Sequence, residues 1–137
     1  MANNYTEFSF LLLCSQEEAQ KVIARYDDNK DSFDMDSDEY FEQYSGILYD
    51  VVGGGVWVHD DEGEGNVEAA IVFCQTYLRE VGKPNQGVII EWATTCSKPR
   101  LNEFFGGAVL VTADEVNSIS AENELRRLAS ESGVELI

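Results

Sequence analysis

The stretch Gly87–Asp114, GVIIEWATTCSKPRLNEFFGGAVLVTAD, predicts two neighbouring strands on which the rest of the chain can be arranged. The strands are Val88–Thr94 and Ala108–Thr112, and both are rich in residue types that suit a pleated, half-buried surface. Successive side chains of a strand point to opposite faces, and both faces of the first strand carry apolar residues. We therefore expect the pair inside a sheet, with the basic residues Lys98 and Arg100 in the connecting loop.

The N-terminal part of the chain predicts a strand followed by a helix. Apolar residues alternate along Phe8–Leu13, which is typical of a buried strand. Ser15 and Glu18 have the spacing of a capping box, in which each side chain accepts a hydrogen bond from the other residue's amide. The helix that follows, residues 15–26, is expected to end at the turn-forming cluster Asp27-Asp28-Asn29.

The middle of the chain predicts a short helix, a hairpin and a long helix. The short helix is Asp38–Tyr44. Two apolar runs, Ile47–Val52 and Val56–His59, flank three consecutive glycines, which can adopt the positive φ angles that a tight hairpin turn requires. Asn66 is a typical N-cap, and it precedes the clearest helical periodicity in the chain, over residues 66–81.

The C-terminal part predicts one more helix. Thr112 and Glu115 have the spacing of a second capping box, and the helix is expected to run through Val116 and Ile119 and onward with a kink at Ser120. The sequence thus predicts a single α+β domain, residues 1–137, with a mostly antiparallel sheet and helices packed on one face. The order of the elements fits a ferredoxin-like split β-α-β arrangement with an added strand and helix.

Composition excludes several classes of function. The 137 residues include 26 acids and 9 bases, so the formal net charge is −17. Such a charge repels phosphate groups and excludes direct binding to nucleic acid or to an anionic membrane surface. It favours a basic protein surface as the partner. The alternative is that the acidity serves only solubility or adaptation to a salty cytoplasm.

The cysteines and the N-terminus indicate a reducing, cytoplasmic location. The three cysteines, Cys14, Cys74 and Cys96, have no paired spacing, and the first two lie in apolar patterns where a free Cys acts as a small hydrophobe. The N-terminal apolar run is too short for a signal core or a membrane span.

The acidic residues are concentrated in one region. Residues 31–78 contain twelve acids and no Lys or Arg, and aromatic residues are interspersed among them. Uniform charge on a folded scaffold produces a field that attracts a basic partner, and aromatic residues can anchor an interface. The competing interpretation is that the aromatic residues form core and the acids a solvated face. The predicted partner-binding residues are Asp34, Asp36, Asp38, Glu39, Glu42, Asp60, Asp61, Glu62, Glu64 and Glu68. Those at 60–64 are favoured, because a hairpin and a capped helix would hold them rigidly.

The spacing of Asp27, Asn29, Asp31 and Asp38 matches positions one, three, five and twelve of an EF-hand calcium loop. Ser32 stands where the EF-hand turn needs Gly, and Asp38 is shorter than the usual bidentate Glu. Calcium is therefore not expected to be required. Neither a cofactor nor a metal site is predicted.

The block Thr95–Arg100, TCSKPR, continues into FFGGAV and VTA over residues 104–113. It resembles a block found in small acidic uncharacterised proteins of bacteria and their mobile elements, a resemblance that implies no activity and no role for any residue. In charge and size alone, the chain also resembles phage-encoded DNA mimics, which are small acidic inhibitors of restriction or CRISPR machinery.

Together these features predict a non-enzymatic inhibitor whose acidic face occupies the nucleic-acid site of a basic defence protein. One alternative is an immunity protein that neutralises a nuclease toxin by the same electrostatics. The other is a small enzyme that uses His59, Asp60 and Cys96, which requires the fold to bring these residues together.

Overall fold

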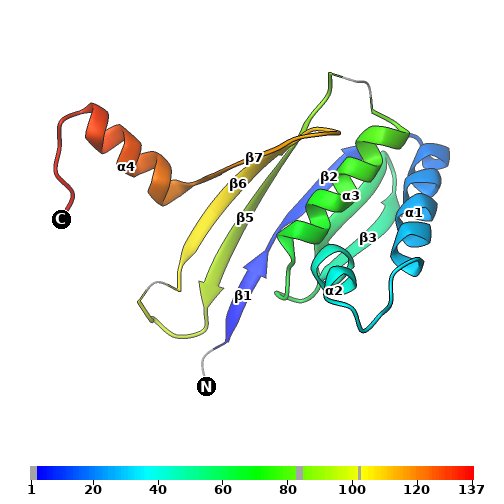
Figure 1. Cartoon of the computed structure of the whole chain (residues 1–137), viewed down its shortest axis with the longest axis horizontal. Helices are drawn as coiled ribbons and strands as arrows, with labels where there is room; N and C mark the ends of the chain where they lie inside the picture. The colour runs from blue at the N-terminus through cyan, green and yellow to red at the C-terminus, as the bar shows by residue number, and fades with distance from the viewer. Residues whose placement is uncertain (1–2, 83–84, 102) are drawn as a thin grey trace.

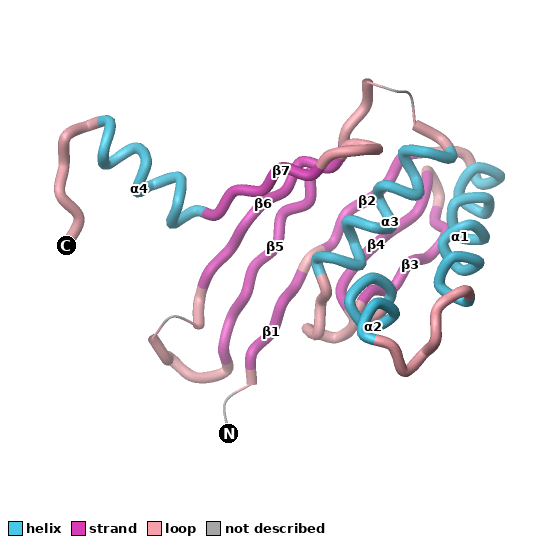
Figure 2. The backbone as a smooth tube through the Cα atoms, in the orientation of Figure 1, coloured by secondary structure: helices cyan, strands magenta, loops and turns pink. Residues whose placement is uncertain are grey.

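A computed structural model of the chain describes residues 3–82, 85–101 and 103–137, which form four helices and seven strands (Figures 1 and 2). The elements follow one another as β1 (Asn4–Glu7), β2 (Ser9–Leu13), α1 (Gln16–Asp31), α2 (Asp38–Tyr44), β3 (Ile47–Val52), β4 (Gly55–Asp60), α3 (Val67–Glu80), β5 (Val88–Cys96), β6 (Phe105–Val111), β7 (Val116–Ser120) and α4 (Ala121–Glu131). The fold class is α+β, as the sequence predicts.

The strands form two antiparallel sheets in place of the single sheet that the sequence suggests. One has the order β1-β5-β6-β7 and the other the order β2-β4-β3. The predicted central pair is confirmed: β5 pairs with β6 over seven residues, from Val88 opposite Val111 to Thr94 opposite Phe105. The predicted hairpin is confirmed as the β3–β4 pair, with Val52 opposite Gly55 at the turn.

The first strand of the chain passes from one sheet to the other at Phe8. Its first part, β1, pairs with β5, and its second part, β2, pairs with β4. Phe8 is buried and separates the two parts. The sequence predicts only the second part, as the strand Phe8–Leu13, because Asn4–Glu7 contains a single aromatic residue and lacks the apolar alternation that indicates a strand. If β1 and β2 are counted as one strand, the connectivity is the predicted split β-α-β. The elements β6, β7 and α4 are appended to it.

The core lies between the helices α1 and α3 and the covered face of the sheets. Figure 1 shows α1, α2 and α3 on the same side of the β2-β4-β3 sheet. Tyr26 of α1, Phe73 of α3 and Tyr49 of β3 meet with ring centroids 4.8 to 5.2 Å apart. Burial raises the pKa of Tyr49, and the hydrogen bond that its hydroxyl donates to Asp27 Oδ1, 2.5 Å long, raises it further.

Helix starts follow the sequence closely. Ser15 and Glu18 form both hydrogen bonds of the predicted capping box, and Asn66 accepts from the Ala69 amide at the start of α3. The end of α1 differs from the prediction: the helix continues through the Asp27-Asp28-Asn29 cluster to Asp31. Tertiary contact outweighs the local turn preference here, because Asp27 is held against the sheet by Tyr49.

The predicted helix at Val116–Ile119 is wrong. These residues form β7, which pairs with β6, and the helix begins only at Ala121 with Ser120 as its N-cap. The predicted local hydrogen bond is nevertheless present, since the Glu115 amide donates to Thr112 Oγ1 over 2.9 Å. The Thr112 amide also donates to the Glu115 carbonyl, which closes a hairpin turn in place of a first helical turn.

The face of the sheets away from α1 and α3 carries exposed apolar side chains, and we refer to it as the open face. Its exposed apolar members include Leu11, Leu13, Leu48, Trp57, Ile89, Leu110 and Ile119. Within the described ranges, no helix is long and apolar enough to cross a membrane.

Candidate functional site

The first group of predicted partner-binding acids lies on α2 and the turn before it. Asp34, Asp36, Asp38, Glu39 and Glu42 are all solvent-exposed. Asp34 Oδ1 accepts from the Asp36 amide at 3.0 Å, and Ser37 caps the helix by accepting from the Tyr40 amide. These local hydrogen bonds fix the backbone from which the carboxylates project.

The second group lies in the loop between β4 and α3, where Asp61, Glu62 and Glu64 are exposed. Asp60 differs from them, because both of its carboxylate oxygens are engaged: Oδ1 accepts from the Phe8 amide at 3.0 Å and Oδ2 from the Gly63 amide at 2.8 Å. Asp60 therefore holds the loop against the point where the first strand changes sheets. It is a structural residue and not a free partner-binding carboxylate.

The two groups meet at the C-terminal end of α2. Asn66 Nδ2 donates to the carbonyls of Phe41 and Glu42, at 3.2 and 2.9 Å, and so ties the start of α3 to α2. A recess of about 530 Å³ at this junction is lined by Phe41, Glu42, Asn66 and Glu68. The tertiary structure thus joins residues that the sequence separates by 24 positions or more. We call the exposed acids of both groups, with Glu68, the acidic surface.

Within the part of the chain that the structure describes, the carboxylates of the acidic surface form no ion pair with a cationic side chain. In the described ranges, the arginine ion pairs join Arg25 to Glu80 and the arginines of α4 to glutamates of the same helix. Aside from these, His59 lies 3.5 Å from Asp50, which does not belong to the predicted set. The acids of this surface are therefore available to cationic groups of another molecule.

Two apolar side chains project among these acids. Phe41 is 71% exposed and Met35 is 75% exposed. Most of the other aromatic residues of the region belong to the core, as Tyr44 does beside Tyr26, with ring centroids 5.1 Å apart. Sequence analysis does not single out Met35, although its position between Asp34 and Asp36, away from any apolar periodicity, is a signal for an exposed side chain.

The residues of the enzyme alternative are not brought together. His59 lies opposite Ser9 on β2, whereas Cys96 lies opposite Asn4 on β1. Five residues of extended strand separate those two positions, a distance of about 16 Å. The His59 ring stacks on Trp57, and its Nδ1 is 2.9 Å from the Asp60 carbonyl, to which it donates. This geometry provides no base–nucleophile pair.

The cysteines are free thiols in poorly reactive surroundings. Burial raises the pKa of Cys74, and burial together with the charge of Glu18 raises the pKa of Cys14. A raised pKa reduces the fraction of thiolate, which is the nucleophilic form. Cys96 is buried at the end of β5.

The calcium-like spacing does not form a loop, because Asp27, Asn29 and Asp31 all lie within α1. A helix turns about 100° per residue, so alternate residues point to nearly opposite sides and cannot surround one ion. Among the described residues, no cluster of three or more metal-ligating side chains is present.

In the Cys96–Arg100 loop, Lys98 and Arg100 are exposed and take part in none of the ion pairs of the described ranges.

The structural role of Asp60 leads to a stability prediction. Replacing Asp60 with Ala leaves the amides of two buried residues, Phe8 and Gly63, without their acceptors, and is expected to lower the free energy of unfolding by about 2–4 kcal/mol. Asp61→Ala, the matched control at the exposed neighbouring position, should change it by less than about 0.5 kcal/mol. Urea unfolding followed by circular dichroism measures both, and equal effects would show that Asp60 does not hold the loop.

The acidic surface presents carboxylates and two apolar side chains to solvent. Exposed carboxylates accept charge-assisted hydrogen bonds from Lys and Arg, and the two exposed apolar side chains can bury area against a partner. None of the protein-family models, curated proteins or solved structures with which the chain was compared matches it.

Proposed function

We propose that this protein is a non-enzymatic inhibitor that binds the nucleic-acid-binding surface of a basic protein through its acidic surface. The observation that supports this proposal is that the exposed carboxylates of the acidic surface have no cationic partner in any ion pair formed by the described residues. They are gathered on one side of a folded scaffold in a chain of net charge −17.

A cleft that binds nucleic acid presents Lys and Arg side chains arranged for phosphate groups. Carboxylates can replace phosphates there, because an Arg fork binds either group in a bidentate manner. Long-range attraction between the two fields accelerates association, and Phe41 and Met35 add the apolar contacts that slow dissociation.

The target class that fits this chemistry is a basic defence protein of the restriction or CRISPR type. A nuclease toxin carries the same kind of cleft, and the inhibitor would then act as an immunity protein. Both targets predict that duplex DNA and this protein compete for one site on the partner.

The proposal is tested with two sets of charge-neutral replacements that spare Asp60. The first set changes Asp34, Asp36 and Asp38 to Asn and Glu39 to Gln, and the second changes Asp61 to Asn with Glu62 and Glu64 to Gln. The control variant carries Glu17→Gln, Asp114→Asn and Glu135→Gln, three exposed acids outside the acidic surface. The control matches the second set in charge.

Immobilised protein captures binding partners from a lysate of the native host at low salt, and the captured protein is released with a 25-base-pair DNA duplex as the competitor. Affinity for the purified partner is then measured by calorimetry at several salt concentrations. Each set is expected to weaken binding about tenfold or more, and the second set more strongly because Asp60 holds that loop. The control should weaken it less than about threefold. Equal losses in the control and the two sets, or a captured protein that DNA does not release, would contradict the proposal.

A further inference from the structure

The C-terminal helix α4 has an apolar side without a partner in its own chain. Ala121, Leu125, Leu128 and Ala129 follow helical spacing and form one stripe along the helix. None of the residues of α4 is buried, and Leu125 and Leu128 are 61% and 43% exposed. Figure 1 shows α4 projecting beyond the end of β7, away from the other helices. An isolated helix of eleven residues is marginal in water, so packing is the expected source of its stability.

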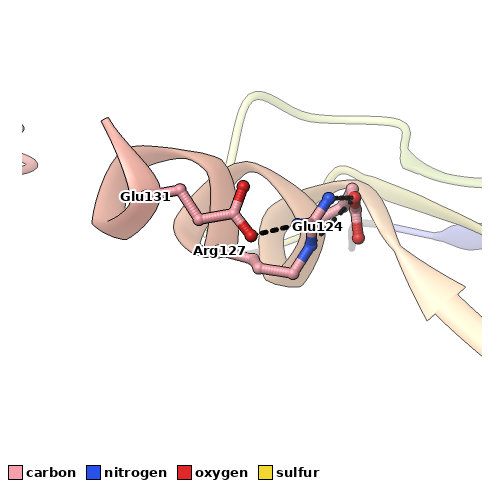
Figure 3. A network of polar contacts seen from close by, with 3 residues as sticks. All are labelled: Glu124, Arg127 and Glu131. Carbon is pink, nitrogen blue, oxygen red and sulfur yellow. Dashed lines mark hydrogen bonds and ion pairs between the residues drawn. The ribbon is translucent and has the colours of Figure 1, made fainter. Parts of the chain in front are cut away.

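The polar side of α4 is already satisfied within the helix. Figure 3 shows Arg127 between Glu124 and Glu131, with its Nη1 2.6 Å from Glu131 Oε1, and Arg126 Nη2 lies 2.8 Å from Glu122 Oε1. These pairs stabilise the helical conformation and leave no unpaired Arg on α4 to attach it to an acidic surface. The apolar stripe is therefore the side of α4 that is available for packing.

The strand before α4 has a free edge. Among the described residues β7 pairs only with β6, and its five residues, VNSIS, include no charge and no Pro. Natural edge strands usually carry such residues, because they prevent pairing with another chain. Val116 and Ile119 of this strand are also exposed, at 44% and 59%. An unprotected edge followed by an unpacked amphipathic helix is suited to pairing with another strand.

The accessible surface of the chain is larger than that of a compact monomer of the same mass. The accessible surface is 9120 Å² for a mass of 15.3 kDa. A compact monomer of this mass exposes about 7,100 Å². The excess of roughly 2,000 Å² is more than the about 800 Å² per partner that a standard protein–protein interface buries. The projecting α4, which has no buried residue, contributes to this excess and offers area for a dimer contact.

We propose that a second copy of this chain covers these surfaces, with the two β7 strands paired antiparallel and each α4 lying on the open face of the other copy. Antiparallel pairing places Ser120 of one copy beside Val116 of the other, so each α4 starts at the end of the partner's sheet where Val116 lies. Val116 is opposite Val111, next to Leu110, and Leu110 is opposite Ile89. Leu110 and Ile89 are the open-face residues nearest to that helix.

The arrangement explains why α4 does not cover these residues in its own chain. Within one copy, Ser120 lies opposite Gly107, at the other end of β6 from Leu110. A helix that begins at Ser120 therefore starts far from the exposed pair Leu110 and Ile89. When each α4 packs on the other copy, its apolar stripe covers Leu110 and Ile89, which α4 leaves uncovered in its own chain.

A second copy also fits the charges. Two chains of net charge −17 repel each other, but the proposed contact uses β7, which has no charges, and the apolar stripe of α4. In Figure 1 the helix α2, which carries part of the acidic surface, lies at the opposite end of the molecule from α4. The dimer therefore leaves both acidic surfaces free, and it is independent of the partner binding proposed above.

Light scattering coupled to size exclusion tests the proposal on the full chain. Wild type is expected to have the mass of two copies of 15.3 kDa at micromolar concentration. The double variant Leu125→Asp, Leu128→Asp should weaken the dimer about a hundredfold or more and give a monomer. The control, Asn123→Asp with Ser130→Asp, adds the same charge on the polar side of α4 and should remain a dimer. Circular dichroism verifies that the core is folded in both, since α4 has no buried residue.

Two further measurements distinguish the proposed dimer from a dimer formed through other surfaces. Ser118→Cys, at the middle of β7, should give a dimer linked by a disulfide under mild oxidation, whereas wild type under the same conditions should not. Added salt should strengthen the dimer, because it screens the repulsion between the chains, while binding of a basic partner should weaken. A monomeric wild type, a dimer that survives the double leucine variant, or absence of the Ser118→Cys link would each overturn the proposal.

Discussion

Replacing Phe73 with Ala is expected to lower the free energy of unfolding by about 3–5 kcal/mol, which is a large part of the stability of a domain of this size. Phe73 is fully buried at the centre of α3, and its ring lies 4.8 Å from that of Tyr26 and 5.0 Å from that of Tyr49. The substitution leaves a cavity where α1, α3 and the β2-β4-β3 sheet meet. Urea unfolding monitored by circular dichroism measures the loss.

Phe41→Ala is the matched control, because the same side chain is removed at a position that is 71% exposed. It should change the free energy of unfolding by less than about 0.5 kcal/mol. For binding, the proposed function predicts that removal of the Phe41 ring has the larger direct effect, since Phe41 lies among the carboxylates of the acidic surface and Phe73 lies in the core. If Phe41→Ala destabilised the fold as much as Phe73→Ala, the assignment of core and surface aromatic residues would be wrong.

The second large effect is expected at the hairpin between β3 and β4. Gly55 has a φ of +153° and pairs with Leu13, and a Cβ atom built on it would lie 1.9 Å from the Leu12 carbonyl oxygen. Gly55→Ala therefore has to separate β4 from β2, with a loss of about 3 kcal/mol or more, or failure to fold. Thermal unfolding by calorimetry measures this loss.

The neighbouring glycines provide graded controls for this experiment. A Cβ atom on Gly54 would contact nothing within 4 Å, but its φ of +101° makes Gly54→Ala strained, with a cost of about 1–2 kcal/mol. Gly53 has neither obstacle, so Gly53→Ala should be neutral or slightly stabilising. A uniform response along the three positions would indicate that turn flexibility, and not the contact with Leu12, determines the effect.

The sequence predicts the features that depend on neighbouring residues. The Ser15–Glu18 capping box, the Asn66 cap and the glycine hairpin form as expected, because each is complete within a few residues. The helical periodicity over residues 66–81 likewise predicts α3, whereas the full burial of Phe73 and Ile90 is seen only in the structure. The concentration of acids between residues 31 and 78 is likewise a property of the sequence alone.

Where a local pattern is compatible with two structures, or indicates none, tertiary contacts determine which structure forms. The hydrogen bond from the Glu115 amide to Thr112 Oγ1 suits a helix start and a hairpin turn equally, and pairing of the following residues with β6 selects the turn. The apolar alternation from Phe8 to Leu13 indicates β2, whereas the mostly polar residues of β1 form a strand because they pair with β5.

Tertiary structure also decides which acids are free. Asp60 and Asp61 are neighbours of the same type, but Asp60 accepts two backbone hydrogen bonds while Asp61 is exposed to solvent. Asn66 brings the loop that contains them to the end of α2, 24 residues earlier in the chain, and so forms one acidic surface from two groups. Composition alone determines that the protein is strongly acidic, whereas the location of the free carboxylates depends on contacts between residues distant in the sequence, which leave no local pattern.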